Sequence, residues 1–179
     1  MKTLTLMRHA KSGWDDMDLR DFDRRLNAKG RRAAGVVGRH LRGLGLGFDH
    51  LVASPAVRVM ETLEEAGAAF GARPNPQWDK RLYLASAATL LDVVREQADA
   101  HGRVLMVGHN PGLEDLLALL VPFTGDGLRA EAALKYPTAT VAELSLPIER
   151  WRDAAGDTAT LIRFIRPRDL DPSLGPDER

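Results

Sequence analysis

The sequence predicts an α/β fold, a three-layer α/β/α sandwich around a mostly parallel central sheet. Short apolar runs of the length of buried strands alternate along the chain with segments of helical period, the pattern that α/β proteins show. One of these runs, at 104–107, is apolar without interruption. Continuous apolar runs are typical of strands buried inside parallel sheets.

Each element follows from a local pattern. Five apolar runs are predicted as strands, at residues 3–7, 51–53, 104–107, 140–146 and 160–165. The last two are expected to form a hairpin at a sheet edge. Four segments with apolar residues three or four positions apart are predicted as helices, at residues 27–44, 54–70, 86–98 and 110–120. Ser54-Pro55 and Asn110-Pro111 each place a capping side chain before a proline, a combination that starts helices.

Length and composition favour one domain. The chain has 179 residues, of which 44% are hydrophobic and 28% charged, which suits a single core. We expect one domain over residues 1–166 and a flexible tail over 167–179, where prolines and mixed charges gather. The polar stretch at 10–25 is expected to form a long loop over a site.

Charge and residue content exclude several kinds of function. Lys plus Arg and Asp plus Glu both number 25, so no basic excess favours a nucleic-acid partner. The chain has no cysteine and no HxH or HExxH spacing, so neither a metal nor another cofactor is expected. Without a signal-peptide core or a membrane-spanning run, we expect a cytoplasmic protein with no membrane partner. The oligomeric state is not predicted.

Polar residues follow three of the predicted strands at the point where each strand ends. The first strand is followed by Arg8 and His9, the second by a helix that carries Arg58 in its first turn, and the third by His109 and Asn110. Ligands of α/β sheets bind outside the carboxyl ends of the strands. We therefore expect these side chains, and the starts of two helices, to meet at one sheet edge.

This set of groups suits a phosphoryl group. The planar fork of arginine matches phosphate oxygens in pairs, and helix N-termini add free N–H groups. An unprotonated imidazole can attack phosphorus and hold the group covalently, while a second histidine stabilises the oxygens as charge builds on them. The flanking arginines are expected to disfavour the imidazolium form of His9.

Three motifs resemble, in the same order, those of the histidine phosphatase superfamily, whose fold is phosphoglycerate mutase-like. Residues 6–12, Leu-Met-Arg-His-Ala-Lys-Ser, resemble its Arg-His-Gly signature, with Ala10 in place of the glycine. Residues 52–63 resemble the motif that supplies a second phosphate-binding arginine, and residues 107–111 the motif that supplies a second histidine. The resemblance covers about the first 120 residues.

The resemblance assigns roles to six residues. It implies that His9 is the nucleophile and that the phosphate pocket is formed with Arg8, Arg58 and His109. Further candidates for substrate binding are Ser12 and Asn110.

Within the superfamily, the sequence is most similar to the SixA-type phosphohistidine phosphatases. The Arg-His-Ala-Lys-Ser opening and the segment Asp-Phe-Asp-Arg-Arg-Leu-Asn at 21–27, leading to Gly30, carry this similarity. Arg25 stands where that group is expected to have proline, which affects the local turn. The similarity implies phosphohistidine on a signalling or carrier protein as the substrate.

The position of the usual proton donor supports the same subgroup. Phosphomonoesterases of this superfamily supply a carboxylic acid to the departing alkoxide, and Tyr83 stands where that acid is expected, with Asp79 out of register. Imidazole, with a pKa of about 6.5, leaves more readily than an alkoxide. The missing acid therefore suits P–N cleavage, although a carboxylate from the loop at 15–23 is another source.

Several alternatives stay open at this point. A phosphatase for a small phosphoester metabolite is favoured if a carboxylate lies over the pocket. A non-catalytic phosphoprotein-binding domain would share the same pocket, although His9 is present as the nucleophile. A mutase needs a more enclosed site, and a nucleic-acid-binding module needs a basic face.

Overall fold

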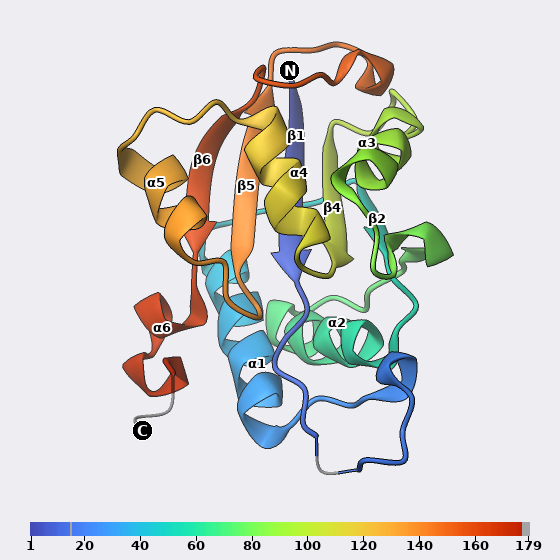
Figure 1. Cartoon of the computed structure of the whole chain (residues 1–179), viewed down its shortest axis with the longest axis vertical. Helices are drawn as coiled ribbons and strands as arrows, with labels where there is room; N and C mark the ends of the chain where they lie inside the picture. Colours follow the sequence, from blue (N-terminus) through green and yellow to red (C-terminus); the bar gives the residue numbers. More distant parts are fainter. Residues whose placement is uncertain (15, 177–179) are drawn as a thin grey trace.

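A six-stranded sheet forms the middle layer of the fold, which a computed structural model describes for residues 1–14 and 16–176 (Figure 1). Its strands are β1 (Lys2–Arg8), β2 (His50–Ala53), β3 (Gln77–Trp78), β4 (Arg103–Gly108), β5 (Val141–Leu146) and β6 (Thr160–Ile165). Their order across the sheet is β3-β2-β4-β1-β5-β6. The first four pair in parallel, whereas β5 runs antiparallel to β1 and to β6. The predicted mostly parallel sheet and its edge hairpin are confirmed.

Helices cover both faces of this sheet (Figure 1). One face carries α1 (Ala28–Gly43) and α2 (Val57–Phe70), and the other carries α3 (Ala87–Arg95), α4 (Gly112–Leu120) and α5 (Gly127–Leu134). Short 3-10 turns occur at η1 (Asp21–Asp23), η2 (Lys80–Leu82), η3 (Trp151–Asp153) and η4 (Pro172–Leu174). No helix in the described residues is long and apolar enough to cross a membrane.

Strand β4 is buried on both faces, which explains its continuous apolar sequence. In β4, Val104 and Met106 pack into the cluster beneath α3 and α4, while Leu105 and Val107 pack toward α1 and α2. Successive side chains of a strand point to opposite faces of the sheet, so a strand covered on both sides needs apolar residues at every position.

The predicted helix starts agree with the structure at two positions and need correction at two others. Asn27 caps α1 by accepting from the Gly30 N–H, and Ser86 caps α3 by accepting from the Thr89 N–H. In contrast, α2 begins at Val57, three residues after Ser54. The prediction was wrong there because the Ser54 hydroxyl contacts another part of the chain instead of capping the helix.

The start of α4 and the end of α3 also differ from the predictions. Helix α4 begins at Gly112, after a cis Asn110-Pro111 bond, and Asn110 Oδ1 accepts from the Glu114 N–H at 3.2 Å. Helix α3 ends at Arg95, three residues before the predicted end at residue 98, and Ala98 is exposed.

The segment after β6 corrects the expectation of a disordered tail at 167–179. Residues Pro167–Leu170 form α6, followed by η4, and both elements lie beside α1 (Figure 1). Leu170 and Leu174 pack against the core on that side, and Lys29 Nζ donates to the Gly175 carbonyl at 2.5 Å. These contacts hold residues 167–176 against the domain, and residues 177–179 lie outside the described residues.

Candidate active site

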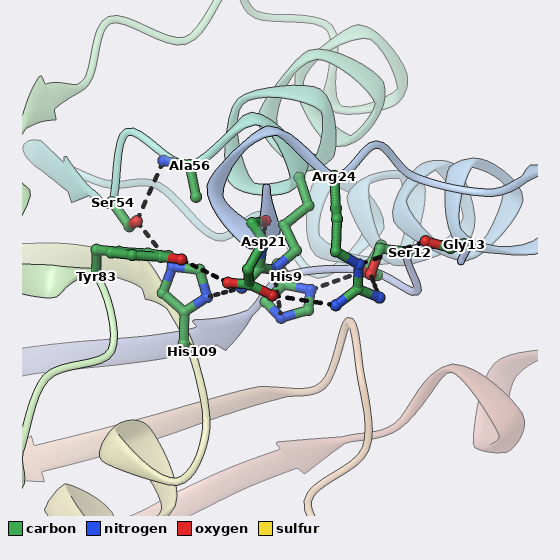
Figure 2. Close-up of polar contacts among 11 residues, drawn as sticks. His9, Ser12, Gly13, Asp21, Arg24, Ser54, Ala56, Tyr83 and His109 are labelled. Atoms are coloured by element: carbon green, nitrogen blue, oxygen red, sulfur yellow. Dashed lines mark hydrogen bonds and ion pairs between the residues drawn. The ribbon is translucent and has the colours of Figure 1, made fainter. Parts of the chain in front are cut away.

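The carboxyl ends of three parallel strands bring the predicted site residues to one edge of the sheet. Strand β4 lies between β1 and β2 and pairs with both in parallel. Arg8 and His9 lie at the end of β1, Arg58 lies in the first turn of the helix after β2, and His109 follows β4. The rings of the two histidines lie with their centroids 5.2 Å apart, and the Asp21 side chain lies beside them (Figure 2). The predicted meeting of these side chains is observed.

His9 is held with one ring nitrogen free of a proton. Its Nδ1 lies 2.7 Å from the Ala10 carbonyl oxygen, which can only accept, so Nδ1 carries the hydrogen. Nε2 then accepts from Arg58 Nε at 3.3 Å. The backbone around the ring is anchored on both sides, since the His9 N–H donates to the Gly108 carbonyl and its carbonyl accepts from the Ala139 N–H. This tautomer presents the Nε2 lone pair to the pocket.

The surroundings of His9 keep its imidazole neutral. The pKa of His9 is lowered to about 3, first by burial and further by the charges of His109, Arg58 and Arg8, against the hydrogen bond to Ala10, which acts to raise it. The expected direction is therefore right, but the largest cause is burial of the ring and not the arginines. A side chain that is only 8% exposed loses the hydration that would stabilise its cation.

Arg58 joins both histidines to the loop over the pocket. Its Nε donates to His9 Nε2, and its Nη2 lies 3.3 Å from His109 Nδ1. Its Nη1 donates to the Asp21 carbonyl at 2.6 Å, and its Nη2 donates to Asp21 Oδ2 at 3.1 Å. The guanidinium is buried, so its charge acts through a medium that screens it weakly.

His109 has the complementary arrangement. Arginine can only donate, so His109 Nδ1 accepts from Arg58 and Nε2 carries the proton, which it donates to Ser54 Oγ at 2.8 Å. Ser54 Oγ also accepts from the Ala56 N–H. The pKa of His109 is lowered to about 4, first by burial and then by the charge of Arg58, while the charge of Asp21 opposes this shift.

Arg8 lies beside this group and reaches the loop before β5. Its Nη1 donates to the Tyr136 carbonyl at 3.0 Å. Its Nε is buried and has no hydrogen-bond partner among the described residues. Burial lowers the pKa of Arg8, and the charge of Glu114 opposes this effect. A buried guanidinium N–H without an acceptor indicates a place for an anionic ligand.

The two further candidates, Ser12 and Asn110, hold loops in place. Ser12 Oγ accepts from Arg24 Nη2 at 2.7 Å. The Asn110 amide donates to the Tyr136 carbonyl and accepts from the Glu114 N–H. Within residues 1–14 and 16–176, neither forms a hydrogen bond to His9 or His109.

Three residues at the pocket were not among the six site candidates, although the sequence had pointed to Tyr83 as standing in place of the usual acid and to the loop at 15–23 as a source of a carboxylate. The η1 turn places the Asp21 carboxylate against Arg58, and Tyr83 donates its hydroxyl to Asp21 Oδ2 at 2.5 Å (Figure 2). The Tyr83 ring packs edge-on against His109, with centroids 5.4 Å apart. Arg24 donates to Asp21 Oδ1 at 3.2 Å and lies over the Trp14 ring. The available signal was the number of carboxylates and arginines in the loop that follows His9.

Asp21 is a carboxylate and not a proton donor in this arrangement. Partial burial acts to raise the pKa of its carboxyl, but the hydrogen bond from Tyr83 and the charge and hydrogen bond of Arg58 outweigh burial and lower the pKa to about 2. Burial and the carboxylate itself raise the pKa of Tyr83. Near neutral pH, the pocket mouth therefore holds an anion and a protonated phenol.

The described residues do not suggest a metal centre. No group of three or more His, Cys, Asp and Glu side chains in this part of the chain is arranged to hold a metal ion. The four predicted site residues instead supply two arginine cations and two neutral imidazoles, which suit a tetrahedral anion.

Comparisons with known proteins identify the family of the chain. The sequence model of the histidine phosphatase superfamily (branch 1) matches residues 4–83. An uncharacterised protein of Mycobacterium tuberculosis is 34% identical over 164 residues, which cover 90% of this chain and all of the relative. The chain therefore belongs to the histidine phosphatase superfamily and is a phosphatase of that class.

Similar solved structures place it more narrowly. A protein of Nakamurella multipartitia assigned as the phosphohistidine phosphatase SixA is 32% identical, with a TM-score of 0.78 over 93% of this chain and 96% of that one. A SixA protein of Agrobacterium tumefaciens, with the same assignment, is 28% identical, with a TM-score of 0.76 over 92% and 97%. Within the superfamily, this protein is of the SixA type.

Proposed function

We propose that this phosphatase hydrolyses phosphohistidine on a protein through a covalent phospho-His9 intermediate, without a metal ion. The observation that carries the proposal is the state of His9, which is buried and neutral and presents a proton-free Nε2 beside Arg58. The substrate class is supported by the SixA proteins to which the chain is similar, both assigned as phosphohistidine phosphatases. A phosphorylated signalling or carrier protein in the cytoplasm would be the partner.

The first step transfers the phosphoryl group to the enzyme. His9 Nε2 attacks phosphorus, the P–N bond to the substrate breaks, and its electron pair stays on the leaving imidazole nitrogen. The Nδ1 hydrogen bond to the Ala10 carbonyl stabilises the positive charge that develops on the His9 ring. Arg58, Arg8 and His109 would hold the phosphoryl oxygens as charge builds on them.

The second step releases phosphate. Water attacks the phosphorus of phospho-His9, the P–Nε2 bond breaks, and its electron pair returns to Nε2. Both hydrogens of the water leave with the product as dihydrogen phosphate, so His9 returns to its neutral tautomer. This sequence needs no metal-bound hydroxide, because the nucleophile of the first step is an imidazole.

One observation favours a second candidate, a phosphatase for a small phosphoester. Asp21 lies over the pocket, where a carboxyl group could protonate a departing alkoxide. Its pKa of about 2 keeps it ionised near neutral pH, which leaves an alkoxide without a donor from this residue. A departing imidazole with a pKa of about 6.5 has less need of a proton donor, so phosphohistidine is the preferred substrate hypothesis.

The test compares two substrates in the presence of a chelator. We would measure phosphate release from a phosphohistidine-bearing protein and from p-nitrophenyl phosphate, with His9→Ala as the inactive variant and His40→Ala, in the last turn of α1, as its matched control. We expect kcat/KM to favour phosphohistidine at least about tenfold and His9→Ala alone to lose activity. A trapped phosphoenzyme should be stable in alkali, labile in acid and absent from His9→Ala.

Other outcomes would select the alternatives. A preference for the ester would move the assignment to a small-molecule phosphatase with Asp21 as the acid. Binding of phosphoprotein without turnover would favour the non-catalytic domain.

A further inference from the structure

The carboxylate of Asp21 is fixed at the mouth of the pocket by three side chains from different parts of the chain. Arg58 holds the carbonyl and Oδ2, Tyr83 donates to Oδ2, and Arg24 donates to Oδ1 (Figure 2). The side chain remains 42% exposed. A carboxylate is thus held in one place and is still accessible to a group that enters from solvent.

This carboxylate lies near both catalytic histidines, but among the described residues its hydrogen bonds go to Arg58, Tyr83 and Arg24 and to neither histidine. Arg58 Nη2 bridges Asp21 Oδ2, at 3.1 Å, and His109 Nδ1, at 3.3 Å, and Arg58 Nε reaches His9. One guanidinium therefore separates the fixed negative charge from the place where the phosphoryl group reacts. The charge of this carboxylate reaches that place, because it acts to raise the pKa of His109 against burial.

The ease with which phosphohistidine loses its phosphoryl group depends on whether its imidazole ring is protonated, and a nearby negative charge affects that protonation. When the second ring nitrogen of phosphohistidine carries a proton, P–N cleavage releases neutral imidazole. When it does not, cleavage must release an imidazolate anion, which is a far stronger base and a poorer leaving group. A nearby carboxylate favours a protonated imidazole ring, so it favours the form of the substrate that leaves easily.

We propose that Asp21 is a specificity-determining residue that accepts a hydrogen bond from the ring N–H of the substrate phosphohistidine and keeps that ring protonated until the P–N bond breaks. This inference rests on the proposed function. The atoms balance without a proton donor: His9 Nε2 gains the phosphoryl group, the P–N electron pair stays on the substrate nitrogen, and the proton beside Asp21 remains on the other nitrogen. The leaving group is then neutral imidazole.

The same charge disfavours phosphoesters. An alkyl or aryl leaving group has no N–H to give to the carboxylate, and the oxygen that departs carries negative charge next to Asp21. Like charges at short range repel, so the carboxylate selects for P–N bonds and against P–O bonds. Tyr83 and Arg24 act as positioning residues through their hydrogen bonds to it.

The test uses Asp21→Asn in the full-length enzyme. Its matched control is Asp23→Asn, because Asp23 lies in the same η1 turn and pairs at the surface with Arg20. We expect Asp21→Asn to lower kcat on phosphohistidine protein by about tenfold or more, the effect of losing a charge-assisted hydrogen bond. Release from p-nitrophenyl phosphate should stay the same or rise, and Asp23→Asn should change neither.

A pH profile separates this role from a structural one. The groups that face Asp21 are Arg58 from α2, Tyr83 after η2, Arg24 from the loop and His109 after β4. None of them changes between the two substrates. We expect the alkaline limb of kcat on phosphohistidine to move about one pH unit lower in Asp21→Asn, with no such shift on the ester. Equal melting temperatures and equal vanadate binding would show that the variant is folded.

The outcomes distinguish this inference from the proposed function. If the wild type does not prefer phosphohistidine, the proposed function fails and this inference fails with it. If the wild type prefers phosphohistidine but Asp21→Asn changes both substrates alike, or neither, only the inference is overturned. Selective loss of ester hydrolysis would overturn it as well, by making Asp21 a general acid.

Discussion

Two neutral histidines buried in one pocket should make the stability of the protein depend on pH. His9 and His109 are 8% and 4% exposed, and burial, with neighbouring charges, lowers their pKa values to about 3 and about 4. In the unfolded chain both should titrate near pH 6.5. Below about pH 6.5 the histidines of the unfolded chain bind protons while those of the folded protein stay neutral. The free energy of unfolding should therefore fall as the pH falls below about 6.5.

The size of the effect follows from these pKa values. One pKa unit corresponds to about 1.4 kcal/mol, and between about pH 7 and pH 5 each unfolded histidine becomes almost fully protonated while each folded one stays neutral. Each should therefore remove about 2 kcal/mol of stability over this range, and the pair about 4 kcal/mol. Asp21 acts in a different window, since a carboxyl whose folded pKa is lowered to about 2 loses its contribution only below its unfolded pKa.

Urea unfolding at a series of pH values would measure this dependence. The buffers must be free of phosphate, because a ligand that binds only the folded state would add stability of its own. Replacing His9 or His109 by Asn should each remove about 2 kcal/mol of the difference between about pH 7 and pH 5. As a control, Val94→Ala, at a buried position of α3, should lower the free energy of unfolding by the same amount at every pH. A flat wild-type profile, or an unchanged slope in both histidine variants, would refute the neutral state of the two buried histidines.

Two further predictions concern the framework of the site, and both use thermal and urea unfolding. Gly38→Ala should lower the free energy of unfolding by about 1–3 kcal/mol, because its Cβ would overlap the Ala66 carbonyl where α1 meets α2. Gly35→Ala, with open space around its Cβ, should raise the free energy of unfolding by about 0.5–1 kcal/mol. Equal effects of the two substitutions would contradict the close packing at Gly38. Thr62→Val should cost about 1–3 kcal/mol and lower kcat, because Thr62 Oγ1 accepts the Ala10 N–H at 2.9 Å and its loss leaves that buried donor unpaired. Thr62→Ser should restore most of both, and a Val variant as stable as the wild type would disprove this role.

The residues whose meeting the sequence predicted all lie at or after the carboxyl ends of strands, and Arg58 does so in the first turn of the helix after β2. The sheet order puts β4 between β1 and β2, so the rule for parallel sheets was enough to bring His9, Arg58 and His109 together. The strand signals were strong because both faces of the central strands are buried. No knowledge of loop conformation was needed for this part of the site.

The residues that the sequence did not place depend on loops and on tertiary contacts. Asp21 and Tyr83 are 62 positions apart and meet only because two short turns fold over the pocket. Ser54 has the local pattern of a helix cap, but a hydrogen bond to His109 competes with that use and prevails. Similarly, the proline-rich sequence after β6 suggests disorder, yet Leu170 and Leu174 gain enough burial against the core to order it.

At two positions this chain has a different residue from the family pattern, and at both of them main-chain atoms form the hydrogen bonds. Ala10 replaces the glycine of the signature, but its carbonyl accepts from His9 Nδ1 and its N–H donates to Thr62, and its small side chain is fully buried in the core. Arg25 replaces the expected proline, and its carbonyl accepts from the Gly13 N–H, a bond that proline would also make. Since main-chain atoms make the bonds at both positions, these substitutions leave the tautomer of His9 and the course of the loop over the pocket intact, and neither counts against a catalytic site.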